Sequence, residues 1–245
     1  MKLQFDAKQE YQIAAVDAAV DLFDGQPLNK GDFEISFEAT GQGLFASQVQ
    51  TELGIGNKLV IDREVLLKNL QRVQERSELD VDAKLLPEDF YSQTIPAPLN
   101  FSVEMETGTG KTYVYLRTIF ELNRKYGFKK FIIVVPSVAI REGVLNAIEL
   151  TREHFQSLYG NAPLDYWVYD SAQVSKLRQF SAGSQMQLMV MNIQAFDKSS
   201  TIIQNTRDQM SGRKPIEFIR HARPVVVLDE PQNLAMELRT KAIES

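Results

Sequence analysis

A glycine-bearing turn at residues 104–112, with the sequence EMETGTGKT, constrains this chain more than any other stretch. It follows an apolar segment, Phe101 to Met105, and precedes a stretch with helical periodicity. Because the glycines at 108 and 110 lack a Cβ, the backbone can turn tightly and point successive N–H groups at one oxyanion. The positive end of the following helix also attracts that oxyanion. The turn therefore predicts a phosphate-binding loop between a strand and a helix.

Two side chains of the turn extend this prediction to a nucleotide. Lys111 would reach the outer phosphates, and the Thr112 hydroxyl would ligate Mg²⁺. The general pattern has a glycine six positions before the lysine, where this chain has Met105. A surface turn that merely contains Gly-Lys-Thr is the alternative, and the position between a strand and a helix argues against it. The residues expected to bind the nucleotide here are Glu106, Thr107, Gly108, Thr109, Gly110, Lys111 and Thr112.

The composition is that of an ordinary globular protein. The chain has 245 residues, of which 44% are hydrophobic and 24% charged, so it can bury a sizeable core. It has no cysteine, which excludes disulfides, cysteine nucleophiles and thiolate metal sites. No apolar run approaches the roughly 20 residues that span a bilayer, so we expect a cytoplasmic protein without membrane contact. The net charge of −5 argues that any nucleic-acid contact is a local patch.

Short apolar runs alternate with helical or loop stretches from residue 101 onward. This alternation predicts an α/β fold, doubly wound, with a parallel sheet flanked by helices and with ligands at the carboxyl ends of the strands. The predicted strands are Phe101 to Met105, Phe131 to Val135, Trp167 to Tyr169, Leu188 to Met191 and Val225 to Leu228.

Three longer helices are predicted from apolar periodicity: Asp6 to Phe23, Thr112 to Tyr126 and Val138 to Leu158. The first leaves Gln12 off its apolar stripe, near its start, where a side-chain amide could read the donor and acceptor edge of a base. An ordinary polar helix residue would look the same.

Residues 26–98 differ from the rest and separate the Gln12 helix from the phosphate loop. Alternating Phe33, Ile35 and Phe37 predict a half-buried strand, and Asp62 is a possible N-cap for a further helix. We expect this region to be an accessory insertion of mixed α/β structure.

Two adjacent carboxylates, Asp229 and Glu230, directly follow four consecutive apolar residues. At the carboxyl end of a buried strand, Asp229 could hold Mg²⁺ while Glu230 polarises the water that attacks the γ-phosphate. The same pair in a solvated loop would have no such role. Pro231 fixes the exit of the strand, and Gln232 is a candidate relay between nucleotide and substrate sites.

The residues 105–112 and 229–232 together resemble the motor region of superfamily 2 helicases, and most closely the Res subunit of type III restriction enzymes. In that family the residue six positions before the lysine is commonly methionine, so Met105 becomes a match. The resemblance implies a RecA-like ATP-binding domain over residues 1–245, with 26–98 as the insertion. It also implies ATP and Mg²⁺ as cofactors and catalytic roles for Lys111, Asp229 and Glu230.

Further segments resemble motifs of the same family. The Gln12 segment resembles the one whose glutamine reads adenine. Residues 135–141 resemble a motif that touches the nucleic-acid backbone, and residues 191–196 resemble a second such motif. A helix start and a guanidinium suit phosphate, although a plain strand-to-helix turn would look alike. The DNA contacts implied are Ser137, Arg141, Asn192 and Gln194.

The resemblance implies the N-terminal part of an ATP-dependent subunit that translocates on double-stranded DNA, cuts it and works with a modification (methyltransferase) subunit. In the family, a coupling strand, a second motor domain and a nuclease domain follow. These would lie beyond Ser245, so we expect a domain incomplete at its C-terminus that alone binds nucleotide weakly and hydrolyses it poorly. The alternatives are a stand-alone helicase-like ATPase and an assembly module with a vestigial ATPase.

Overall fold

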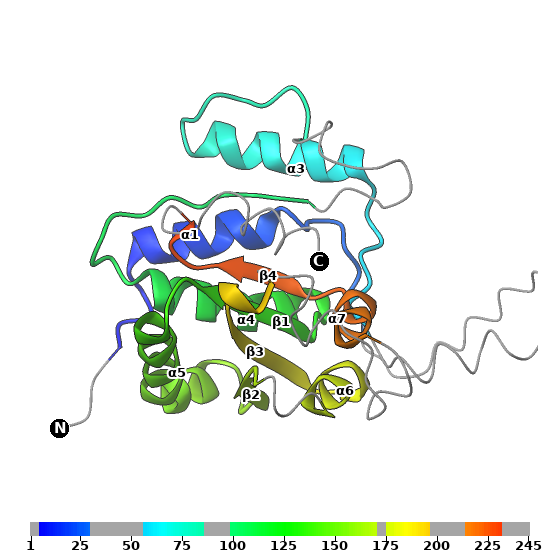
Figure 1. Cartoon of the computed structure of the whole chain (residues 1–245). Helices are drawn as coiled ribbons and strands as arrows, with labels where there is room; N and C mark the ends of the chain where they lie inside the picture. The colour runs from blue at the N-terminus through cyan, green and yellow to red at the C-terminus, as the bar shows by residue number, and fades with distance from the viewer. Residues whose placement is uncertain (1–4, 30–55, 86–98, 171–174, 197–213, 232–245) are drawn as a thin grey trace, which may run out of the picture. The chain divides into compact units, whose positions relative to one another are not determined.

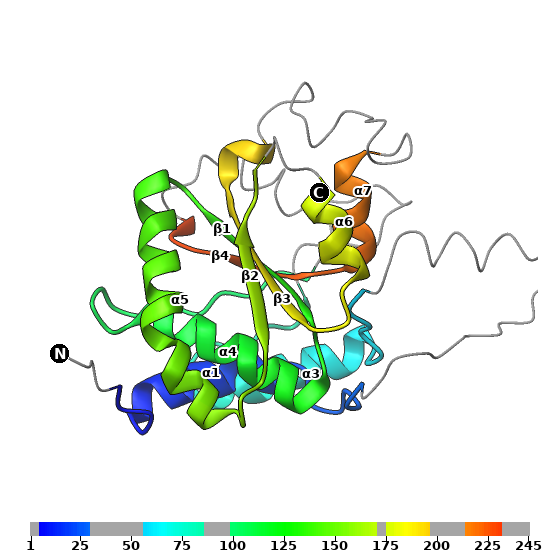
Figure 2. The same ribbon diagram turned by 90° about the horizontal axis from the view of Figure 1, so that it is seen from below.

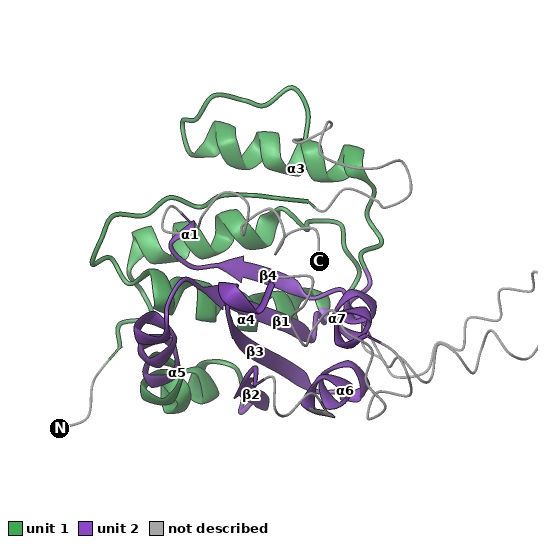
Figure 3. Cartoon of the chain, viewed as in Figure 1, with its two compact units in different colours: residues 1–28, 59–126, 147–160 green, residues 29–58, 127–146, 161–245 purple. Residues whose placement is uncertain are grey.

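The structure is a computed structural model that describes residues 5–29, 56–85, 99–170, 175–196 and 214–231 (Figure 1). The chain forms two compact units (Figure 3). The first contains residues 1–28, 59–126 and 147–160, and the second contains residues 29–58, 127–146 and 161–245. Within the described ranges, no helix is both long and apolar enough to cross a membrane.

The second unit is built on a parallel sheet, which has four strands in the described part of the chain, in the order β2-β3-β1-β4. The strands are β1 (Lys130–Val135), β2 (Leu164–Val168), β3 (Met186–Asn192) and β4 (Val225–Leu228). β1 pairs with β3 on one side and with β4 on the other. Since every pairing is parallel, the carboxyl ends of all four strands lie at the same edge of the sheet.

Every residue of β1 is buried, which explains why this strand is a continuous run of apolar residues after its first position. On one face of the sheet, Ile132 and Val134 pack with two short helices, α6 (Ser175–Ala182) and α7 (Pro215–Ala222). These helices lie side by side in both views (Figures 1 and 2). Fully burying one such aliphatic side chain contributes about 1.5–3 kcal/mol, so this cluster supplies much of the stability of the unit.

Asn57 joins the start of β1 to the end of α7. Its side-chain oxygen accepts from the N–H groups of Lys129 and Lys130 at 2.8 and 3.1 Å, and its amide nitrogen donates to the Lys130 carbonyl at 2.8 Å. Its backbone N–H donates to the Ala222 carbonyl at 2.9 Å. The side chain thus takes the place of a neighbouring strand where β1 begins, one residue before the pairing with β4 starts at Phe131.

In the first unit, α1 (Glu10–Asp21) lies between α3 (Arg63–Arg76) and α4 (Lys111–Tyr126) (Figure 1). The predicted N-cap of α3 is confirmed, because the Asp62 carboxylate accepts from the Val65 N–H at 2.9 Å. The predicted end of α4 is also confirmed, because Gly127 has a φ of +74° that terminates the helix.

The long helix α5 (Val138–Leu158) has the predicted bounds, and its C-terminal half belongs to the first unit. There Phe155 stacks on Tyr113 and packs against Phe120, with ring centroids 5.2 and 5.0 Å apart. Offset aromatic pairs of this kind add about 0.5–1.5 kcal/mol beyond their buried area. These contacts bury the apolar stripe of α4 that periodicity predicts.

The predicted α/β class with a parallel sheet is confirmed, but one predicted strand is wrong. Residues Phe101 to Met105 form neither helix nor strand and pair with none of the described strands. Val103 is 48% exposed, whereas a strand inside a parallel sheet is buried on both faces. A short apolar run becomes a strand only where a neighbour accepts and donates its backbone hydrogen bonds, and this run lies outside the unit that contains the sheet.

The remaining strand predictions are confirmed: β4 has the predicted bounds, and the bounds of β1, β2 and β3 are shifted. β2 starts three residues before the predicted Trp167, although the Tyr169 N–H still donates to the Val190 carbonyl at 2.9 Å. The alternating run from Phe33 to Phe37 lies outside the described residues. The single domain over residues 1–245 with an insertion at 26–98 stays a prediction.

Lys130 is a fully buried cation at the start of β1. Its Nζ donates to the carbonyls of Phe180 and Gly183 and, at 2.7 Å, to Gln187 Oε1. The ammonium also lies 5.5 Å from the centroid of the Phe180 ring. Burial, with a smaller contribution from neighbouring Lys129, lowers the pKa of Lys130 from 10.5 to about 8.

This pKa predicts that stability rises with pH. Between pH 8 and 10.5 the unfolded chain keeps the proton on Lys130 and the folded chain has lost it, so the free energy of unfolding increases with pH. The expected gain is about 3 kcal/mol at roughly 1.4 kcal/mol per pH unit. Urea unfolding from pH 7 to 10.5 should show this rise in the unsubstituted chain and in Lys58→Met, which removes an exposed lysine. It should be absent in Lys130→Met, and equal slopes in all three proteins would contradict the assignment.

Candidate functional site

The glycine-bearing turn adopts a conformation that only glycines allow easily. Gly108 and Gly110 have φ angles of +83° and +87°, in the left-handed region. Between them, Thr109 folds back on Glu106, whose carbonyl accepts from the Thr109 N–H at 3.4 Å and from the Thr109 hydroxyl at 2.7 Å. Glu106, Thr107 and Gly108 are exposed. The loop is therefore held by its own backbone while its tip faces solvent.

The loop leads directly into the N-terminus of α4, as predicted. The Val114 N–H is the first to find a helical acceptor, the Gly110 carbonyl at 3.0 Å. The N–H groups before it have no acceptor one turn earlier in the helix and carry the positive end of its dipole. A Cβ built at Gly108 would meet nothing within 4 Å, so the space beside this position is open. This geometry fits a phosphate group, with half-buried Lys111 and Thr112 opening the helix beside it.

Gln12 is more buried than its position in the sequence predicts. The sequence places it off the apolar stripe, but its side chain is only 8% exposed. Its Nε2 donates to the Thr109 carbonyl at 2.9 Å, and a Cβ built at Gly110 would come within 2.7 Å of that nitrogen. The helix α1 therefore packs directly on the loop through this amide. Burial of Gln12 is favourable because the loop satisfies its polar group.

Two contacts fix the segments around α1 and α4. Arg117 of α4 donates to the Ala7 carbonyl, just before α1, at 2.7 Å. Tyr113 shares a 2.8 Å hydrogen bond with His154, and burial lowers the pKa of that histidine. His154 is thus a packing partner of α4.

In the second unit, Asp229 lies at the carboxyl end of β4. Its N–H donates to the Val134 carbonyl at 3.0 Å, which extends the β1–β4 pairing by one residue. Glu230 then turns into the left-handed region with a φ of +50°, a strained conformation for a residue with a Cβ. Both carboxylates are half-buried. Strain of this kind persists where the surrounding structure holds the chain in a particular direction, here at the exit of a strand.

The predicted DNA contacts lie at the same edge of the sheet, since β1 and β3 end side by side with Val135 opposite Asn192. Ser137 caps α5 by accepting from the Ile140 N–H at 3.3 Å, and its own hydroxyl hydrogen still needs an acceptor. Gln194 follows β3 in the short helix η1 (Ile193–Phe196) and donates to the Pro136 carbonyl at 3.2 Å. The structure thus brings these two segments together.

The other two predicted DNA contacts, Arg141 and Asn192, are less well placed to bind a phosphate. The Arg141 guanidinium, 24% exposed, pairs with its neighbour Glu142 at 3.0 Å. Such a pair is worth less than about 1 kcal/mol and can be exchanged for another anion. The buried Asn192 Oδ1 has no hydrogen-bond partner within the described residues, and an acceptor oxygen cannot bind a phosphate oxygen.

The structure groups the predicted site residues by unit. Gln12 and the phosphate loop with Lys111 and Thr112 belong to the first unit, and Asp229, Glu230 and the four predicted DNA contacts belong to the second. Gln232 lies outside the described residues. Their action on one nucleotide stays a prediction. Among the described residues there is no group of three or more carboxylate or imidazole side chains placed to hold a metal, so Mg²⁺ there would need phosphate or water oxygens as further ligands.

Sequence reasoning missed Asn69, which is 2% exposed and connects α3 to the end of α1. A signal was present, because Asn69 stands three residues after Leu66 and therefore on the buried face of the helix. A polar residue on such a face needs a polar partner, but its spacing does not say which one.

The parallel sheet and the glycine-bearing turn before a helix define a RecA-like α/β fold. The family model for the type III restriction enzyme Res subunit matches residues 8–244, and the chain belongs to this family.

Three relatives are similar to this chain over part of their length. The Res subunit of the type III restriction-modification enzyme StyLTI from Salmonella typhimurium strain LT2 is 33% identical over 157 residues, 56% of this chain. The EcoP15I Res subunit from Escherichia coli is 29% identical over 156 residues, also 56% of this chain. The EcoPI Res subunit from Escherichia phage P1 is 29% identical over 175 residues, 70% of this chain. In each case the similar region is 16% of the relative's length.

The loop geometry predicts different costs for alanine at three glycines. Gly110→Ala should destabilise most, because it combines a left-handed φ, worth about 1–2 kcal/mol, with a clash against Gln12. Gly108→Ala should cost only the backbone term, since its Cβ would meet open space. Gly143→Ala, in the second turn of α5, should stabilise by about 0.5–1 kcal/mol. Urea unfolding of the three variants would measure this order, and equal costs at 108 and 110 would contradict the role of Gln12.

Proposed function

We propose that this chain is the N-terminal motor region of an ATP-dependent restriction subunit that translocates on double-stranded DNA and cuts it. The observation that carries the proposal is the glycine loop, held open at the N-terminus of α4 by the Gln12 amide at 2.9 Å from the Thr109 carbonyl. Family membership supports the same conclusion. The region of similarity covers only 16% of the length of the StyLTI Res subunit, so the activity, substrate and partners of the whole protein are part of what we propose.

In the first unit, the loop would hold the phosphates of ATP. Backbone N–H groups of the loop other than that of Thr109, together with those at the start of α4, would donate to phosphate oxygens, and Lys111 would neutralise the outer ones. The Thr112 hydroxyl would ligate Mg²⁺. The Gln12 amide nitrogen donates to the Thr109 carbonyl at 2.9 Å and, more weakly, to the Tyr11 hydroxyl at 3.5 Å, and an exchange of this weaker bond would let the amide read the adenine edge.

In the second unit, Asp229 and Glu230 would carry the chemistry of hydrolysis. Asp229 would hold Mg²⁺ through water, and Glu230 would orient and deprotonate the attacking water. The hydrogen bond from Asp229 to β1 supports this role, because it fixes the backbone of the first carboxylate. Bound Mg²⁺ would supply charge stabilisation for the phosphoryl transfer.

The edge of the sheet that bears Ser137 and Gln194 would contact the DNA backbone. The Ser137 hydroxyl can donate to a phosphate oxygen, and the Arg141 guanidinium can exchange its exposed partner for one. Gln194 would brace the Ser137 segment through Pro136. Asn192 would act through a water or a side-chain donor. Gln232 would couple the nucleotide site to the DNA contacts. A modification subunit would recognise the specific DNA sequence. The complex would act in the cytoplasm.

The nucleotide roles predict a loss of catalysis without a loss of fold. In the full-length protein, Lys111→Ala and Asp229→Ala should each lower the DNA-stimulated ATPase rate by on the order of 100-fold or more, because each removes charge stabilisation from the transition state. Lys68→Ala and Asp165→Ala, which remove exposed charges of the same sign in each unit, are the matched controls. A rate within twofold of the unsubstituted enzyme for Lys111→Ala would refute the site.

The DNA role predicts a change in salt dependence. Arg141→Ala should weaken duplex binding and lower the slope of log affinity against log salt by about 1, because one phosphate contact is lost. Arg152→Ala is the control, since Arg152 lies on the same helix and pairs with Glu149 at 2.8 Å, although its side chain is more exposed, at 49% against 24% for Arg141. Fluorescence anisotropy of labelled duplex at several salt concentrations measures both. Identical slopes for the two variants would remove Arg141 from the interface.

A further inference from the structure

The accessory helix α3 grips the C-terminal end of α1 through one buried amide. Asn69 Nδ2 donates to the Leu22 carbonyl at 2.9 Å and to the Asp24 carbonyl at 2.8 Å. These carbonyls lie just past the last turn of α1, where helical carbonyls lack partners within the helix. Asn69 therefore caps α1 from another helix, at a site 2% exposed.

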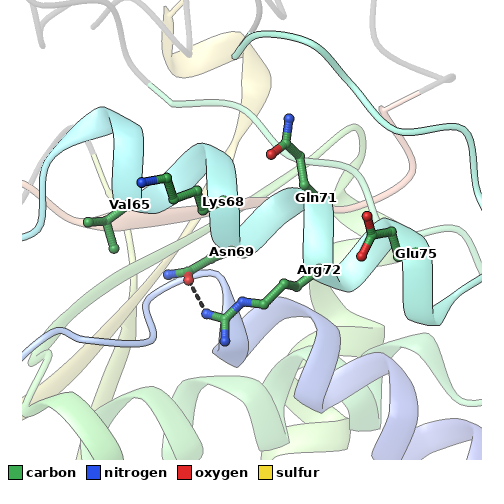
Figure 4. Close-up of a pocket in the computed structure, with 6 residues that line it drawn as sticks. All are labelled: Val65, Lys68, Asn69, Gln71, Arg72 and Glu75. Atoms are coloured by element: carbon green, nitrogen blue, oxygen red, sulfur yellow. Dashed lines mark hydrogen bonds between the residues drawn. The ribbon is translucent and has the colours of Figure 1, made fainter.

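Charged residues surround this amide. The Asn69 side-chain oxygen accepts from Arg72, as Figure 4 shows, and Arg72 pairs with Asp24 at 3.2 Å. Arg76, one turn further along α3, pairs with Asp21 at 2.9 Å. Both pairs are exposed and contribute little individually, although cations near a helix C-terminus are favourable. Arg72 thus mainly orients the amide, and the buried hydrogen bonds hold the two helices together.

The other end of α1 carries Gln12. A helix of 12 residues moves as a nearly rigid rod, so a shift at its C-terminal end also displaces its first turn. At that turn the fit is tight, because Gln12 Nε2 would lie 2.7 Å from a Cβ at Gly110 and is 2.9 Å from the Thr109 carbonyl. Small displacements of α1 would therefore lengthen the bond that holds the loop.

Helix α4 supports α1 independently. The Tyr126 hydroxyl donates to the Val20 carbonyl at 3.1 Å, and Lys125 pairs with Asp21 at 3.2 Å. Loss of the contact with α3 would therefore loosen α1 without releasing it. We therefore expect the contact between Gln12 and the loop to weaken partially and not to be lost completely.

We propose that Asn69 is a positioning residue for the nucleotide: by capping α1 it holds Gln12 against the phosphate loop, so that α3 sets nucleotide affinity. This inference rests on the proposed function, because it takes the loop to be the ATP site. The accessory region, residues 26–98, would then have a regulatory function, because a displacement of α3 would lower the affinity for ATP.

The test is a double-mutant cycle on nucleotide affinity. The dissociation constant of Mg-ATP is measured by calorimetry for the unsubstituted chain, Asn69→Ala, Gln12→Ala and the double variant. Asn69→Ala should weaken binding about fivefold, the equivalent of one lost hydrogen bond. The double variant should bind within about twofold of Gln12→Ala alone, because both changes break the same path. Gln71→Ala is the control, since its amide on the same helix donates to the Asp82 carbonyl and not to α1.

A merely structural role for Asn69 would leave the cycle additive. Additive losses, or Asn69→Ala binding like Gln71→Ala, would overturn the proposal. If Asn69→Ala fails to fold, Arg72→Met decides instead, because Arg72 is 61% exposed and its loss only disorients the amide. Its affinity should fall about twofold, again without additivity to Gln12→Ala, and unchanged affinity would overturn the proposal.

The proposed function fails in a different way. If the unsubstituted chain binds no Mg-ATP, or if Lys111→Ala binds it equally well, the ATP site itself is wrong and the inference falls with it. Tight binding that depends on Lys111 but not on Asn69 would refute the inference alone.

Discussion

The hydrogen bond from the Gln12 amide to the Thr109 carbonyl is the contact on which the first unit depends. It joins a residue near the start of the chain to a loop about a hundred positions later, and it excludes any side chain at 110. Gly110 and the start of α1 fit closely against each other through this amide, whereas the space beside Gly108 is open. Because the amide is buried, leaving it unsatisfied would cost about 1–3 kcal/mol, so the loop and the helix stabilise each other.

In the second unit, parallel pairing plays the corresponding part. β1 pairs with β3 and with β4, so the chain segments that follow these strands emerge at one edge. Ser137 follows β1, Gln194 follows β3, and Asp229 continues the pairing of β4. The segments that bear Ser137, Gln194 and Asp229 therefore meet at the same edge of one sheet. This arrangement is suited to linking nucleotide chemistry to movement on DNA, in keeping with the proposed function.

Local patterns predict the regular elements well where the chain is strongly periodic. The helices that begin near residues 111 and 138 have nearly the expected bounds, since their apolar stripes are long and their ends carry glycine or a serine cap. The run from Phe101 to Met105 has the composition of a strand, but a run of five residues does not indicate whether a neighbouring strand is present to pair with it. The helices α6 and α7 were not predicted individually, because eight residues make only about two turns, too few to establish an apolar period.

The sequence by itself determined the chemistry of the loop: glycine at 108 and 110, then Lys111 and Thr112 at a helix start, because these depend on backbone freedom and on neighbours in the chain. It likewise determined that the strands would be parallel, but the expected burial holds only for β1 and nearly all of β3, since β2 and β4 are partly exposed and Val226 is 40% exposed. Only the tertiary structure decided that Gln12 is buried, that Asn69 caps α1, that Asn57 borders β1 and that Lys130 lies in the core. Each of these polar side chains finds its partners some 45 to 100 residues away. No periodicity encodes such pairings, since hydrogen bonds between distant segments form only after the segments have packed.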